Sequence, residues 1–143
     1  LQNVFMRLWP MPTTTFEPLR REAESASLDD EDYEFTGKKL QAYILHGVRY
    51  TVNTWKEMLI QVCGHILLEK RSTIEWLCAN EKCSFSTTPE EWRRELAPGM
   101  YVWTDNSTAT KINILHGMFE ECNIPASELV FEFRSDQEGE DEE

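Results

Sequence analysis

The chain of 143 residues has the length of one domain with tails, and its apolar fraction of 41% is enough for a core. Its net charge of −12 comes from two segments, residues 13–36 and 135–143, which contribute −6 each; residues 37–134 hold eleven bases against twelve acids. This distribution argues against an acidic surface over the whole chain. Because there is no secretory signal and no apolar run near the ~20 residues of a membrane helix, we expect a cytoplasmic protein with free thiols and no membrane contact.

The same charge pattern predicts how the chain is divided. Residues 1–12 are predicted to be the end of a preceding domain's helix, since an apolar run without N-cap or initiator methionine is ended by Pro10. A processed terminus is the alternative. Residues 13–36 are predicted to be an acidic flexible linker, and residues 135–143 an acidic disordered tail, because low hydrophobicity and like charge do not offset the entropy of ordering. A small domain at 37–134 remains.

The first half of this domain reads as a hairpin followed by helices. Residues 40–45 read as a strand, residues 48–52 alternate and are rich in residues that favour strands, and His46-Gly47 between them is a turn signal. Thr54 to Glu57 fits a capping box, with Asn53 as the competing N-cap, and begins a helix that runs to about Glu69. A shorter helix is predicted at 73–79.

The second half ends in a strand, a helix and a strand. Residues 80–99 are read as irregular, with a short strand at 83–86, a helical turn at 89–92 that begins with proline, and a turn at Pro98-Gly99. A strand at 100–104, a polar loop, a long helix that ends at Asn123, a helical turn at 125–128 and a strand at 129–133 follow. The prediction is an α+β fold of order β-β-α-(α)-β-α-β: a small mixed sheet with two main helices on one face.

No motif for catalysis stands out. Cys78 and Cys83 are the only close cysteine pair, and zinc sites of this kind need a second pair or a pair of histidines. The three histidines lie in no motif with a mechanism, and there is no glycine-rich phosphate loop. We therefore predict no metal, no cofactor and no catalytic residue.

The start of the second long helix is the most suggestive surface. Residues 105–111 bring free backbone N–H groups, hydroxyls and a lysine together, and such an end can hold a phosphate; plain N-capping is the competing interpretation. Trp92 precedes two arginines, which suits nucleic acid, but three neighbouring glutamates lower the positive potential. Trp92 is also a candidate partner-binding residue, with a cap on the core as the alternative. If the domain contacts DNA, we predict contacts at Lys38, Lys39, Arg49, Arg93, Arg94, Asn106, Ser107 and Lys111.

Two parts of the sequence are similar to parts of bacterial restriction proteins. Residues 5–12 (FMRLWPMP) resemble the last helix of the HNH nuclease domain in GmrSD-type proteins, which closes on an "IWP-x-P"-like sequence. Those proteins join an N-terminal ParB-like nucleotide-hydrolysing domain to a C-terminal HNH nuclease. The chain from residue 35 on resembles an uncharacterised domain appended after such nuclease modules, through residues 35–39, 50–59, 99–102 and 106–108.

This resemblance implies a non-catalytic accessory domain of a modification-dependent restriction or phage-defence nuclease, for DNA engagement or for assembly with the parent's other domains. No nuclease residue carries over, because the ParB-like motif and the HNH histidines and asparagine have no counterpart here. Two alternatives remain open. One is a protein–protein interaction module with an acidic autoinhibitory tail, and the other is a small cytoplasmic domain unrelated to nucleases.

Overall fold

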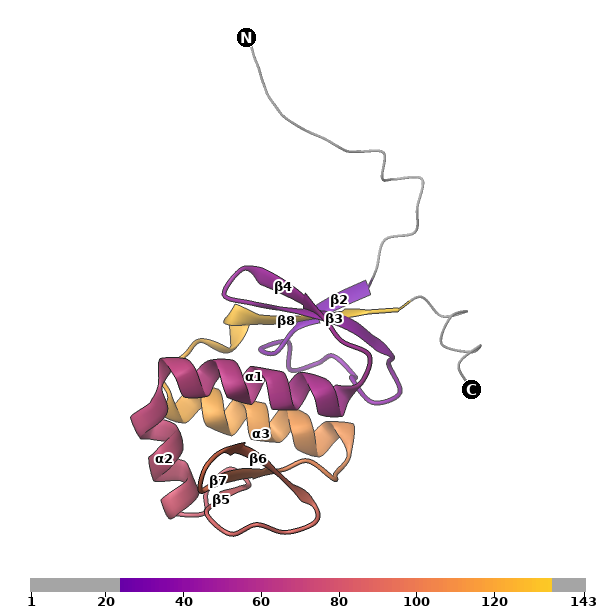
Figure 1. The fold of residues 1–143 in the computed structure, drawn as a ribbon. Helices are drawn as coiled ribbons and strands as arrows, with labels where there is room; N and C mark the ends of the chain where they lie inside the picture. Colours follow the sequence, from indigo (N-terminus) through magenta and orange to yellow (C-terminus); the bar gives the residue numbers. More distant parts are fainter. Residues whose placement is uncertain (1–23, 135–143) are drawn as a thin grey trace.

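The computed structural model describes residues 24–134, in which two antiparallel sheets enclose a layer of helices (Figure 1). One sheet has the strand order β2-β8-β3-β4 and the other β5-β7-β6, and α1 contacts strands of both. Within the described part of the chain, no helix is long and apolar enough to cross a membrane. The elements are β2 (Glu24–Ser27), β3 (Leu40–Leu45), β4 (Val48–Thr51), α1 (Trp55–Glu69), α2 (Arg71–Ala79), β5 (Phe85–Ser86), β6 (Arg93–Ala97), β7 (Met100–Trp103), α3 (Thr108–Glu121), η2 (Ala126–Glu128) and β8 (Leu129–Phe133).

The predicted hairpin and the last strand form the middle of the larger sheet. β3 pairs with β4 on one side and with β8 on the other, both antiparallel. His46 and Gly47 join the hairpin with φ values of 52° and 81°, as a two-residue turn with positive φ at both positions requires. Buried side chains of β3 and β8 contact α1: the Tyr43 hydroxyl forms hydrogen bonds with Gln61 and His65, and the Phe131 ring lies 5.3 Å from the Trp55 ring. This confirmed part of the prediction therefore supplies one wall of the core.

Both long helices begin at a hydroxyl cap. Thr54 Oγ1 accepts the N–H of Glu57 at 3.0 Å, and Ser107 Oγ accepts the N–H of Thr110 at 3.1 Å. The Glu57 carboxylate accepts the N–H of Asn53 at 3.2 Å, one residue earlier than in a standard capping box. The predicted starts of both helices are thereby confirmed, with Thr54 as the cap of α1.

The α+β class is confirmed, but the sheet expected to be single and mixed is two antiparallel sheets. The predicted helical turn at 89–92 is wrong: Arg93 N–H donates to Glu90 O at 3.0 Å in a tight turn, and β6 follows. This edge strand was missed because most of its side chains are charged or polar and little of it is buried. The predicted turn at Pro98-Gly99 then joins β6 to β7, with Gly99 at a φ of 80°.

The linker predicted at 13–36 belongs to the fold from Glu24 onward. β2 pairs with β8 along its whole length, and the N–H of Leu28 donates to Leu129 O at 2.8 Å. Ala26, Leu28 and Phe35 are buried in the core and Tyr33 packs against it, so these apolar contacts outweigh the polar composition around them. The predictions for residues 1–12 and 135–143 lie outside the described residues.

This correction changes the charge of the folded unit. Residues 24–36 carry six acids and no base, so the described residues hold eleven bases and eighteen acids, a net charge of −7. The fold is therefore acidic, and any anion-binding surface on it has to be local.

Candidate functional site

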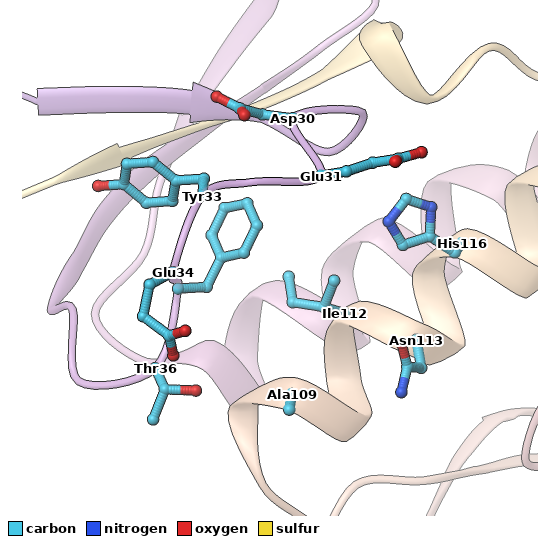
Figure 2. A pocket seen from close by; sticks show the side chains of 10 residues that line it. Asp30, Glu31, Tyr33, Glu34, Thr36, Ala109, Ile112, Asn113 and His116 are labelled. Atoms are coloured by element: carbon cyan, nitrogen blue, oxygen red, sulfur yellow. The ribbon is translucent and has the colours of Figure 1, made fainter.

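The described residues contain two clefts of opposite chemistry. The first, which we call the basic cleft, has a volume of about 690 Å³ and is lined by Lys38, Lys39, Arg134, Asn53, Thr54 and Thr108, among others. The second, the acidic cleft, has a volume of about 450 Å³ and is lined by Asp30, Glu31, Glu34, Phe35, Ile112 and His116, among others (Figure 2).

The basic cleft lies where the N-terminal ends of α1 and α3 meet the segment before β3. Thr54 caps α1, and Thr108 is the first residue of α3. The N-terminal end of a helix carries partial positive charge and backbone N–H groups without intrahelical partners, and therefore favours anions. Two such ends and three cationic side chains share this cleft.

Backbone contacts fix the two lysines in place. The indole N–H of Trp55 donates to Lys38 O at 3.0 Å, and the N–H of Arg134 donates to Lys39 O at 2.8 Å. The Lys38–Lys39 segment is therefore held between the start of α1 and the end of β8. A rigid backbone reduces the entropy lost when the side chains order around a ligand.

Lys38 is already in contact with one acid. Its Nζ lies 3.3 Å from the Glu24 carboxylate and 5.5 Å from the centre of the Tyr33 ring. The hydrogen bond from the Tyr33 hydroxyl and the charge of Lys38 lower the pKa of Glu24 from its usual value. Both side chains are partly exposed, so the contribution of the pair to stability is small and a stronger anion can replace Glu24 as the partner of Lys38.

Three predicted DNA-contacting residues are engaged with their own loop. Lys111 is buried, and its Nζ donates to both the carbonyl and the side-chain oxygen of Asn106, at 2.7 and 2.9 Å. Burial lowers the pKa of Lys111. Ser107 serves as the N-cap. The structure brings these residues together beside the basic cleft: Ser107 has the N-capping role that was the competing interpretation, while Lys111 and Asn106 close the loop.

The remaining predicted residues lie elsewhere. Arg49 pairs with Glu132 at 2.9 Å in the larger sheet, while Arg93 and Arg94 lie on β6 of the smaller sheet, across the helix layer. The eight residues therefore form no single surface; Lys38 and Lys39 alone among them line the basic cleft. Arg134 was missed because its place beside Lys39 depends on the pairing of β8 with β3, which the sequence does not display.

Trp92 is 44% exposed and lines a smaller hollow with Trp103 and Arg93. The Arg93 guanidinium lies 6.0 Å from the centre of the Trp92 ring, and its Nη1 donates to Thr88 O at 2.8 Å. The exposed indole fits the predicted partner-binding role rather than a cap on the core, and the role itself remains a prediction.

The thiols of the described residues are not poised for chemistry. All four cysteines are free, and burial raises the pKa of Cys122 to about 11 and that of Cys63 further. Between residues 24 and 134, no group of three or more histidine, cysteine or acidic side chains could hold a metal ion.

The comparisons add no relative. No family model matches the sequence, and no curated protein or solved structure is significantly similar to it. Arguments about function therefore have to come from the two clefts.

Proposed function

We propose that this domain is a non-catalytic accessory module that engages DNA through its phosphate backbone at the basic cleft. The observation that carries the proposal is the convergence of Lys38, Lys39 and Arg134 with the N-terminal ends of both long helices in one cleft. Phosphate oxygens are the ligands that lysine, arginine and helix N-termini share.

The acidity of the rest of the fold favours a limited contact. With a net charge of −7 over residues 24–134, DNA is repelled from most of the surface and held only where positive groups converge. Such a contact is weak and reads no base sequence, because phosphate contacts position a protein without specifying bases. An accessory role beside a domain that cuts DNA suits this chemistry. On the resemblance described above, we propose that the parent is a modification-dependent restriction or phage-defence nuclease.

Fluorescence anisotropy with a labelled DNA duplex over a salt series tests this function. We expect binding at low salt that weakens steeply as salt rises. The K38A/K39A variant should bind roughly tenfold more weakly and lose about two from the slope of log affinity against log salt. R93A/R94A is the matched control, because it removes the same charge from the other sheet. Absence of binding at every salt concentration, or equal losses in both variants, would contradict the proposal.

A second candidate function concerns the acidic tail. Arg134 lines the basic cleft, and the next nine residues of the chain carry six acids and no base. We propose that the tail competes with DNA for the cleft, in the manner of a tethered ligand at high effective concentration. Replacing its acids by glutamine and asparagine should then raise DNA affinity at low salt, and unchanged affinity would dismiss the competition.

A further inference from the structure

The acidic cleft is a built surface with its own chemistry. On one side, Asp30, Glu31 and Glu34 are exposed, and none of them forms an ion pair within the described part of the chain. On the other side α3 presents Ala109, Ile112 and His116 (Figure 2). Among the described residues, no lysine or arginine lines the cleft.

The floor of this cleft is apolar and anchored in the core. Phe35 and Ile112 are each 8% exposed. The Phe35 ring lies 5.4 Å from the Phe131 ring and 6.1 Å from the Trp55 ring, both edge-on. These contacts hold residues 28–36, which we call the acidic loop, against the larger sheet and α1. Two turn hydrogen bonds, from Asp30 N–H to Ser27 O and from Tyr33 N–H to Asp30 O, fix the backbone from residue 27 to residue 33. The carboxylates are therefore displayed on a held loop, and a partner does not have to order it.

We propose that the acidic cleft docks a basic segment of a partner protein, in which arginine or lysine side chains meet the carboxylates and an aliphatic side chain covers the floor. Charge complementarity selects this occupant, since a cleft edged by three carboxylates, with no lysine or arginine among its described lining residues, repels DNA and attracts cations. The apolar floor favours a peptide over free cations, because an aliphatic side chain gains free energy by covering apolar surface and a hydrated ion does not. This surface does not depend on the proposed DNA contact.

The test is anisotropy with the full chain and a labelled synthetic peptide in which arginine alternates with leucine. A peptide with glutamate in place of arginine is the control ligand. We expect saturable binding of the basic peptide only, weakened roughly fivefold to tenfold in E31Q/E34Q, which removes two exposed charge contacts without changing shape. E90Q/E91Q is the matched control, because both residues are exposed and lie before β6 in the other sheet. This control should bind as the unchanged protein does.

A second variant distinguishes peptide binding at the acidic cleft from attraction by the net negative charge of the protein. Ala109 is exposed in the first turn of α3, so A109R places a long cation at the cleft without disturbing the core. We expect this variant to abolish peptide binding while E120R, at the other end of α3, retains most of it. Equal losses in E31Q/E34Q and E90Q/E91Q, or unchanged binding in A109R, would overturn the site.

The chain itself carries a competing basic segment, Arg20-Arg21, close in sequence to the acidic loop. If these arginines were the occupant, the peptide would bind only in an R20S/R21S variant of the full chain. That result would overturn the assignment to a partner protein. Comparable peptide binding with and without these arginines supports it.

Discussion

Residues 34–39, which we call the connection, contribute to both the acidic and the basic cleft, yet the charged side chains that line the two clefts have opposite signs. Lys38 and Lys39 line one cleft, and Glu34 and Phe35, only a few residues earlier, line the other. The first turn of α3 also divides between them, with Thr108 in the basic cleft and Ala109 in the acidic one. Net charge therefore says little about binding here, because the sign of the local field changes within a few residues.

The difference between the clefts lies in where their charges come from. The basic cleft combines side chains with helix ends from separate parts of the chain, joined by the pairing of β8 with β3 and by the Trp55–Lys38 hydrogen bond. Among the described residues, the acidic cleft takes its carboxylates from one loop, and its floor combines Phe35 of that loop with Ile112 of α3. Substitutions in the connection should affect both clefts, whereas a substitution at the N-terminal end of α1 should affect mainly the basic cleft.

The largest expected effect is that of F35A. Phe35 is buried among Tyr33, Trp55 and Phe131, and removal of its ring leaves a cavity under the connection that both clefts share. Phenylalanine-to-alanine changes in cores cost about 3–5 kcal/mol, a large part of the stability of a small domain. Urea unfolding monitored by circular dichroism measures the cost.

The matched change is W92A, which also removes an aromatic ring but at a position 44% exposed on the smaller sheet. We expect it to lower the free energy of unfolding by less than about 1 kcal/mol, as surface changes usually do. If F35A were as mild, the connection would not be anchored as the structure has it.

T54A should have an intermediate effect and should separate the clefts. Thr54 Oγ1 caps α1 and lines the basic cleft, and loss of such a cap costs about 1 kcal/mol. N53A, at the competing cap position, should cost less, because the bond made there by Asn53 uses its backbone N–H. Urea titrations of the two variants check this, and peptide binding at the acidic cleft should survive in both. A larger cost for N53A would reverse the assignment of the cap.

Local signals were enough for most of the fold. The hairpin turn at His46-Gly47, the hydroxyl cap of Thr54 and the left-handed helix end at Asn123 (φ 63°) all depend on residues close in sequence, and each stands as predicted. The loop before α3 was predicted to hold several possible caps, of which Ser107 is the one used. What failed was decided by distant contacts. β2 is held by pairing with β8, and β6 is a charged edge strand whose only strand partner is β7 within the described residues.

The candidate sites follow the same division. Lys38 and Lys39 could be named from charge alone, and residues 105–111 from the composition of a helix start. Their actual roles needed tertiary structure, since Lys111 is buried against Asn106 while Arg134 joins the lysines through the sheet. The acidic cleft escaped prediction altogether. The sequence of its loop is typical of a flexible linker. The burial of Leu28 and Phe35, which depends on tertiary structure, shows that the loop is anchored to the core.

The smallest expected effect is a pH dependence located away from both clefts. His46 Nδ1 lies 2.9 Å from Glu128 Oε1, and Nε2 lies 2.9 Å from Glu69 Oε1. Both nitrogens can donate only in the protonated ring, and the two carboxylates, Glu128 foremost, raise the pKa of His46 above 6.5. The stability that this contact contributes is therefore fully present below about pH 6.5 and is lost as pH rises through the raised pKa.

Urea unfolding at a series of pH values from 6 to 9 should show this loss in the unchanged protein and not in H46Q, which cannot acquire the charge. The side chains are well exposed, so the change should be a few tenths of a kcal/mol. H116Q is the control: His116 lines the acidic cleft, and none of the carboxylates of residues 24–134 lies at hydrogen-bond distance from it, so this variant should keep the pH slope. A slope that disappears in H116Q and persists in H46Q would move the titrating group from the hairpin to the cleft, and peptide docking would then become pH-dependent as well.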